Sequence, residues 1–266
     1  MIGAIFGDIA GSKYEFHNIK TKDFSLLTPD CTFTDDSVCT IAFIDWLLNA
    51  AERNEETATK YLHKWTRKYP YAGYGGRFRY WVFSDNPKPY NSFGNGSAMR
   101  VSAVAWAAKD LDDLKYLSDT VTKITHNHPE GMKGALVTAT CIYMAIHGSS
   151  KDEIREYAVS QYPEIASLDY EELRKTYCHA EEICQNTVPQ AIYCFLISSD
   201  FHDCAKTTIS IGGDCDTTAA ISCAIAEAFY GVSSDDFKSV KSFLPCEMRE
   251  IVDKASTSNV FFHKKI

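Results

Sequence analysis

The chain has 266 residues, 45% of them hydrophobic and 23% charged, which is ordinary for a folded globular protein and excludes a disordered or fibrous chain. Its 27 basic and 35 acidic residues give a formal net charge of −8, so we expect no stable nucleic-acid partner and no anionic membrane surface as a partner. The sequence lacks an uninterrupted apolar run of about 18 residues, the length of a membrane span.

The ten cysteines raise the question of disulfides or zinc. They include no Cys-x-x-Cys pair, and Cys141, Cys194 and Cys223 lie inside apolar runs, where a thiol behaves as a small hydrophobic side chain. The first ten residues contain Asp8 and no basic leader, so they lack the pattern of a secretion signal. We therefore expect free structural thiols and a cytoplasmic location.

The first third of the chain predicts helices separated by loops. Apolar residues among the first ten recur with the spacing of a helix face, and Gly11 is expected to end this helix. Thr34 or Asp35 is the expected N-cap of the next helix. The expected order is an irregular stretch over 12–30, helices over 38–48 and 55–69, a glycine loop over 71–76 and a short apolar piece over 77–83.

The remaining chain predicts more helices and no strands. After a proline-containing loop over 85–91, a glycine-rich segment over 92–97 leads into a helix through Met99, Val104 and Ala108. Runs with the two-residue alternation of strands are not found, which predicts one all-α domain over 1–266. The further helices are expected over 112–125, 131–147, 151–161, 169–185, 189–199, 200–209 and 216–229, with Gly231 as the final stop.

Two acidic segments open apolar runs. Asp214, Cys215, Asp216 and Thr217 follow a Gly-Gly pair, and Thr34-Asp35-Asp36-Ser37 precedes the run over 38–48. Each segment suits a helix cap, because a side-chain oxygen there accepts hydrogen bonds from backbone N–H groups. Each also suits a hard cation such as Mg²⁺, Mn²⁺ or Ca²⁺ rather than Zn²⁺. Crowded carboxylates repel one another, so two such pairs favour a site in which two helix starts together hold a pair of metal ions.

Three further features have two interpretations each. Glu15 is either a surface residue or a carboxylate that does proton transfer near the metals. The segment over 92–97, and more weakly the loop at 74–76, is either an ordinary turn or a cradle of backbone N–H groups for a phosphate or ribose. His126 is either a hydrogen-bonding residue of a site or a helix-end residue, because the chain has no second His or Cys cluster at zinc spacing.

Five ordered motifs, GDIAGSKYE, FTDDS, SFGNGSAMR, THNHPEG and GGDCDTTAA, make the chain resemble the ADP-ribosylglycohydrolases, relatives of the dinitrogenase-reductase-activating glycohydrolase. The resemblance covers residues 1 to about 231. It implies an all-helical domain with a metal-containing cleft, two Mg²⁺ ions (with Mn²⁺ as an alternative), and hydrolysis of the N- or O-glycosidic bond at the distal ribose. The partner it implies is an ADP-ribose moiety on a modified protein, nucleic acid or small molecule.

The resemblance also implies roles for individual residues. Glu15, Asp35 and Asp36 would be catalytic. The metal ligands it implies are Thr34, Asp35, Asp36, Asp214, Asp216 and Thr217, and the substrate-binding residues are Gly73, Tyr74, Gly75, Ser92, Phe93, Gly94, Asn95, Gly96 and His126.

Three alternatives remain at this point. The chain is a structural protein like the lens crystallins that resemble this family, a non-catalytic ADP-ribose reader, or a hydrolase of another nucleotide-like glycoside. All six implied metal ligands are present in the sequence, as is Glu15. Their presence favours the ADP-ribosyl hydrolase over the structural protein and the reader.

Overall fold

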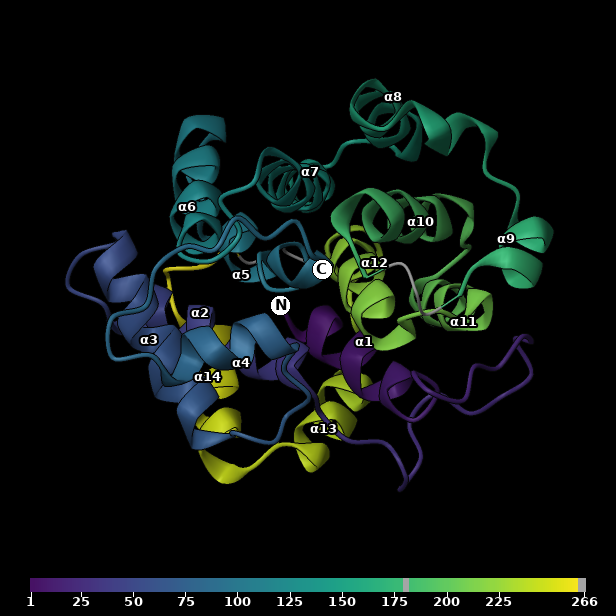
Figure 1. Ribbon diagram of the computed structural model, residues 1–266. Helices are drawn as coiled ribbons and strands as arrows, with labels where there is room; N and C mark the ends of the chain where they lie inside the picture. Colours follow the sequence, from purple (N-terminus) through teal and green to yellow (C-terminus); the bar gives the residue numbers. More distant parts are fainter. Residues whose placement is uncertain (179–181, 263–266) are drawn as a thin grey trace.

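Helix α12 (Cys215–Tyr230) is the central element of the computed structural model, which describes residues 1–178 and 182–262. Every residue from Cys215 to Ala226 is buried, so this helix turns no face to solvent over that length. It packs against α1 (Ile2–Ser12), α2 (Asp35–Asn49), α7 (Pro129–Ile146), α10 (Cys184–Ile197) and α11 (Phe201–Ile211). In Figure 1 the other helices are arranged around α12, and α1 lies directly beside it. A helix without a polar face is stable only when it is enclosed in this way.

The other helices cover this centre. The described residues form fourteen α-helices, two short 3₁₀ helices and one isolated bridge, between Gly94 and Ile183, with no longer strand among them. This confirms the predicted all-α class. The covering helices are α3 (Glu55–Lys68), α4 (Gly76–Phe83), α5 (Ser102–Ala107), α6 (Leu111–Lys123), α8 (Lys151–Gln161), α9 (Tyr170–Thr176), α13 (Ser234–Phe243) and α14 (Cys246–Thr257).

One hydrophobic core collects side chains from Ile2 to Phe261, so the helices form a single compact unit. A small second cluster, which includes Leu173, Tyr177 and Tyr193, joins α9 to α10. Of the ten thiols, eight are buried and all are unpaired, as expected for structural cysteines. Within the described residues, no helix combines the length and the apolar character that crossing a bilayer requires.

Several predicted helix ends are wrong. Gly11 does not end α1, which continues to Ser12, because the missing side chain serves close packing against α12 rather than a turn. Pro189 lies inside α10, whose start at Cys184 is fixed by a hydrogen bond from the Cys184 amide to the Phe93 carbonyl (2.9 Å).

Two other predicted helices are interrupted. The helix expected through Met99 is split into a 3₁₀ turn over Asn95–Ser97 and α5, and the intervening Arg100 is buried. The helix expected over 169–185 ends at Thr176, since Tyr177 takes an extended conformation and buries its ring; residues 179–181 of that prediction lie outside the described residues.

Candidate metal and substrate site

A polar cavity of about 320 Å³ lies where the start of α2, the loop between α3 and α4 and the glycine-rich segment before α5 come together. Carboxylates of Glu15, Asp35, Asp214 and Asp216 line part of it. We call the five residues Asp8, Glu15, Asp36, Asp214 and Asp216 the acidic cluster. The other part of the wall contains Arg77, Tyr90, Arg100 and His126, which we call the basic wall.

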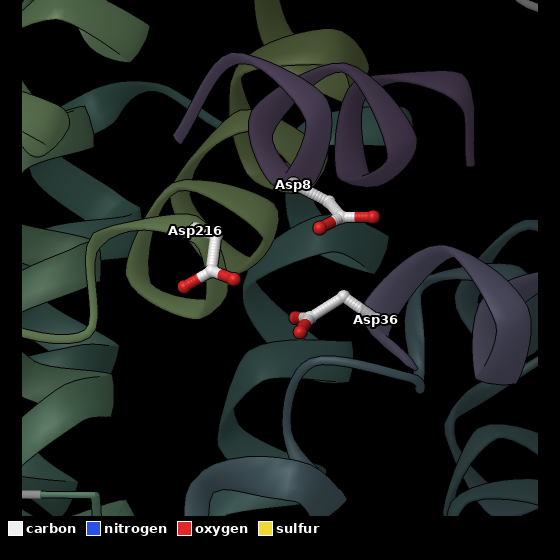
Figure 2. A group of neighbouring side chains, drawn as sticks. All are labelled: Asp8, Asp36 and Asp216. Atoms are coloured by element: carbon white, nitrogen blue, oxygen red, sulfur yellow. The ribbon is translucent and has the colours of Figure 1, made fainter. Parts of the chain in front are cut away.

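Three helices deliver the deepest carboxylates of the acidic cluster. Asp8 comes from α1, Asp36 from the first turn of α2 and Asp216 from the first turn of α12, and Figure 2 shows their carboxyl groups facing a common space. One oxygen from each lies within 4.8 Å of the others. Glu15, Asp214 and Asp216 form a second such group, also within 4.8 Å. Asp216 therefore belongs to both groups and joins them.

A glycine seam sets the distance between α1 and α12. A Cβ atom added at Gly7 would lie 2.2 Å from the Ala219 carbonyl oxygen, and one at Gly11 would lie 2.5 Å from the Asp216 Cα. Gly3 meets the backbone of Cys223 in the same way, at 2.3 Å. Because glycine alone has no Cβ, these three positions allow the helices to touch along their backbones. The seam places Asp8 opposite Asp216.

Asp8 holds the start of α2 in place. Its carboxylate accepts hydrogen bonds from the backbone N–H groups of Thr34 (3.0 Å) and Ser37 (3.1 Å). It also accepts from both hydroxyls, Thr34 Oγ1 at 2.6 Å and Ser37 Oγ. The first turn of a helix has backbone donors without partners, and Asp8 satisfies them from another helix. Asp8 therefore positions Asp36.

Asp36 and Asp216 each keep one oxygen, Oδ1, that is buried and has no hydrogen-bond partner. The other oxygen of Asp36 accepts from Thr217 Oγ1 at 3.1 Å, which connects α2 to α12. A buried carboxylate oxygen without a partner is costly unless a cation or a proton satisfies it. Two such atoms in one cluster of oxygen donors fit a hard divalent cation.

The acidic segments at the starts of α2 and α12 differ in whether their side chains cap the helix. Thr34 is the N-cap of α2, and its hydroxyl accepts from the Asp36 amide at 3.4 Å. Asp214 occupies the N-cap position of α12, but its side chain makes no capping hydrogen bond. It accepts instead from Asn95 Nδ2 at 2.6 Å. Capping thus explains Thr34 and does not explain Asp214.

Burial and mutual repulsion raise the pKa values of these aspartates. Burial raises the pKa of Asp8 to about 6, against the opposing effect of its hydrogen bonds from Ser37 and Thr34. Burial, then the neighbouring charges of Asp8 and Asp214, raise the pKa of Asp35 to about 8. The pKa values of Asp36 and Asp216 are also well above the ordinary value, first from burial and then from adjacent carboxylates. A bound cation would relieve this repulsion.

The loop that carries Glu15 is fixed to the Gly-Gly pair before α12. The Asn18 side chain accepts from the Gly213 amide (2.8 Å) and donates to the Gly213 carbonyl (2.9 Å). Gly213 has a φ of +71°, and a Cβ there would lie 2.4 Å from the Tyr177 ring, so only glycine fits. This attachment keeps Glu15 beside Asp214 and Asp216.

On the basic wall, His126 is part of a buried chain of hydrogen bonds. Arg100 Nη2 donates to Thr125 Oγ1 at 2.5 Å, and Thr125 Oγ1 lies 2.7 Å from His126 Nδ1. The Thr125 hydroxyl accepts from Arg100 and still has a proton that it can donate to Nδ1; in that arrangement the ring carries its proton on Nε2. Burial, then Arg100, hold the pKa of His126 well below its ordinary value, which keeps the ring neutral.

The glycine-rich segment lies against this histidine. Cβ atoms at Gly94 and Gly96 would lie 3.7 and 3.5 Å from His126 Nε2. The segment is fixed by the Asn95 amide, which donates to the Glu182 carbonyl at 3.1 Å, and by the contact of Asn95 with Asp214. Asn95 therefore connects the glycine-rich segment directly to the acidic cluster.

Comparison with known proteins identifies the family. The sequence model described as ADP-ribosylglycohydrolase matches residues 1–253. The chain belongs to this family. It is 28% identical to the mouse ADP-ribosylhydrolase ARH3 over 87% of this chain and 83% of ARH3, and 29% identical to the Rhodospirillum rubrum ADP-ribosyl-[dinitrogen reductase] glycohydrolase over 60% of this chain and 54% of that protein.

A solved structure described as an ADP-ribosylglycohydrolase-related protein complex has the same fold. Its TM-score is 0.67 with 19% identity, and the match covers 96% of this chain and 94% of that one. The resemblance stated from the motifs is thus confirmed, and the chain is an enzyme of the ADP-ribosylglycohydrolase family.

In this family member the structure brings most of the predicted site residues to one cavity. Three do not line it: Tyr74 is buried and its hydroxyl donates to the Thr66 carbonyl, and Phe93 packs on the His128 ring with centroids 5.0 Å apart. The third, Asp36, is buried in the group of carboxylates that it forms with Asp8 and Asp216. The predicted residues that line the cavity are Glu15, Thr34, Asp35, Gly73, Gly75, Ser92, Gly94, Asn95, Gly96, His126, Asp214, Asp216 and Thr217.

The residues of the ADP-ribosylglycohydrolase site that sequence reasoning missed include Asp8 and three members of the basic wall, Arg77, Tyr90 and Arg100. Asp8 was used only as evidence against a secretion signal, although a single carboxylate on an otherwise apolar helix is itself a signal of a buried polar role. Arg77 and Arg100 were passed over because each stands inside an apolar piece. They supply the local positive charge that a chain of net charge −8 needs to bind an anion.

Proposed function

We propose that the protein is a Mg²⁺-dependent hydrolase that removes ADP-ribose from a modified target by cleaving the N- or O-glycosidic bond at the distal ribose. The observation that carries the proposal is the pair of unpartnered, buried oxygens on Asp36 and Asp216, which belong to one group of carboxylates beside a cavity with a basic wall. A sugar with two negative phosphates needs both kinds of surface: oxygen ligands for cations near its hydroxyls and positive charge near its phosphates.

Two Mg²⁺ ions, with Mn²⁺ as the alternative, fit the donor set, because every donor is a carboxylate or hydroxyl oxygen. When bound, they supply electrostatic stabilisation for charge that develops on the ribose. Asp36 and Asp216 offer the free oxygens, and Asp8 keeps α2 in position. The residues proposed to hold the ions are Thr34, Asp35, Asp36, Asp214, Asp216 and Thr217.

The basic wall and glycine-rich segment receive the diphosphate. With the Thr125 hydroxyl donating to Nδ1, His126 Nε2 carries a proton and, with the backbone N–H groups of the segment, offers hydrogen bonds to phosphate oxygens. Arg77 and Arg100 add positive charge along the same wall. The side-chain amide of Asn95 links the glycine-rich segment to Asp214.

Glu15 acts as the general base. It orients a water molecule and takes its proton as the water oxygen bonds to the anomeric carbon of the distal ribose. The bond from that carbon to the target breaks, and the departing nitrogen or oxygen of the target receives the proton that Glu15 took from the water, directly or through solvent, which restores the Glu15 carboxylate. Asp35 and Asp36, predicted as catalytic, contribute by their negative charge beside this carbon.

Isothermal titration tests the binding part of the proposal. ADP-ribose should bind in the presence of Mg²⁺ and lose this binding in EDTA, and Asp216→Ala should abolish it. Product analysis with substrates ADP-ribosylated on arginine, on serine, on nucleic acid and on a small molecule identifies the bond that is cleaved. Binding of equal strength without a divalent ion, or no release of ADP-ribose from any of the four substrates, would contradict the proposal.

A further inference from the structure

A second, more open hollow of about 560 Å³ adjoins the cavity. Glu15, Thr34 and Gly73 line both spaces, so the two lie next to each other at these residues. Under the proposed function this is where the distal ribose lies, with its anomeric carbon beside Glu15. The group attached to that carbon must leave the cavity there, and the second hollow is the space directly next to it.

The loop between α3 and α4 forms one wall of this hollow and holds Tyr71 out into solvent. The loop is fixed on both sides: Tyr69 packs against Trp65 and donates to Glu247 Oε1 at 2.6 Å, and Tyr74 is buried. Between these anchors the Tyr71 side chain is 88% exposed. Its ring, unlike the similarly exposed ring of Tyr80, lies at the hollow and is open to contact with a group that occupies it.

The hollow has aromatic and acidic character. Tyr71, Phe33 and Tyr69 line it together with the carboxylate of Glu15. Its one lysine, Lys68, lies with its ammonium 2.9 Å from Glu247 Oε1, so that positive charge is compensated. Aromatic faces and a carboxylate attract a flat cation, and guanidinium groups are the commonest partners of such faces in proteins.

We propose that this hollow holds the target side of the bond, and that Tyr71 is a specificity-determining residue that stacks on a planar cationic group of the target, such as the guanidinium of an ADP-ribosylated arginine. The proposal rests on the proposed function, since it takes the orientation of the ribose from it. It adds which part of the substrate the protein recognises beyond ADP-ribose, and by which residue.

Steady-state kinetics with Mg²⁺ and two peptides, one ADP-ribosylated on arginine and one on serine, test this proposal. The wild-type protein should hydrolyse the arginine-linked peptide with the higher kcat/KM. Tyr71→Ala should raise KM for that peptide about 5- to 20-fold with kcat within about twofold, as expected for a lost cation–π contact. Tyr71→Phe, which keeps the ring, should behave as wild type.

Tyr80→Ala is the matched control, because Tyr80 is 82% exposed on α4 and lines neither space. It should leave both KM values unchanged, and titration with free ADP-ribose should give the same affinity for all four proteins. An unchanged KM in Tyr71→Ala, a weaker affinity of Tyr71→Ala for free ADP-ribose, or a preference of the wild type for the serine-linked peptide would overturn the proposal. Failure of the wild type to bind ADP-ribose at all would instead overturn the proposed function.

Discussion

The acidic cluster and the basic wall face the same cavity but are built in opposite ways. The deepest acids stand on three helices whose backbones touch or are joined by side-chain hydrogen bonds, as at Gly7 and Asp8. The basic wall and its glycine-rich neighbour stand largely on loops and short turns, joined by contacts such as Asn95 with Asp214. The two parts therefore differ in how much change they tolerate.

The difference follows from what each part is expected to do. Carboxylates that share cations must stay within a few ångströms of one another despite their repulsion, which only a rigid support achieves. A wall of hydrogen-bond donors can adjust around a flexible diphosphate without losing its contacts. Changes in the acidic cluster should thus be severe, and changes in the basic wall graded.

The largest effect is expected for Asp216→Asn, because Asp216 belongs to both carboxylate groups. Removing one charge at this point should lower kcat/KM by at least about 10³-fold, and Mg²⁺ should no longer raise Tm in a thermal-shift assay. Asp235→Asn on α13 is the control, since Asp235 is 92% exposed. A variant at position 216 that keeps the Mg²⁺-dependent rise in Tm would show that the acidic cluster is not the metal site.

Glu15→Gln should separate chemistry from binding. The amide keeps the size of the side chain but takes no proton, so kcat should fall about 10²- to 10³-fold while the affinity for ADP-ribose stays within a few-fold. Single-turnover hydrolysis together with titration calorimetry measures both quantities. A loss of affinity as large as the loss of rate would assign Glu15 to binding rather than to proton transfer.

Gly7→Ala and Gly94→Ala compare the two supports directly. The added Cβ at Gly7 would lie 2.2 Å from a carbonyl oxygen of α12, so we expect roughly 3 kcal/mol of destabilisation and a Tm about 6–12 °C lower. At Gly94, where φ is −59° and the nearest atom would be 3.4 Å away, the free energy of unfolding should change by less than about 1 kcal/mol. Urea titrations measure the free energy of unfolding of both variants. An equal loss in Gly7→Ala and Gly94→Ala would show that the acidic cluster and the basic wall do not differ in rigidity.

The smallest effect is expected on the basic wall. His126→Phe keeps the ring and removes the Nε2 donor, which should weaken ADP-ribose binding about 10-fold, or ~1.4 kcal/mol, and leave the Mg²⁺-dependent rise in Tm intact. His147→Phe, at an exposed position at the end of α7, is the matched control. Loss of the Mg²⁺ effect in His126→Phe would mean that the two parts of the cavity are not independent.

Local signals predicted most of the fold. Helix α8 has the predicted bounds, Lys151–Gln161, because Ser150 and Glu153 form a capping box that any reader of the sequence can recognise. The end of α12 before Gly231 was equally readable, since that glycine has a φ of +83°. The errors at Gly11 and Pro189 have a common cause: contacts with distant parts of the chain decided them.

The site was predictable where its residues are clustered in sequence. The two acidic segments predicted Asp36 and Asp216 as site residues. Repulsion between neighbouring acids was a sound reason to expect that the two segments meet in one site. Asp8 and Arg100 are single polar residues among apolar ones, and their roles depend on partners on other helices, Thr34 for Asp8 and Thr125 for Arg100. No local pattern in the sequence contains that information.

The glycine seam also has a consequence for the order of folding. It joins segments far apart along the chain, as the contact between Cys215 Sγ and the Gly11 carbonyl shows across 204 positions. During synthesis α1 must therefore wait, with its apolar face uncovered, until α12 has been made, and closing so long a loop comes late in folding. The acidic cluster assembles only at that step. Under the proposed function, the ability to bind metal would therefore appear only when nearly the whole chain has folded.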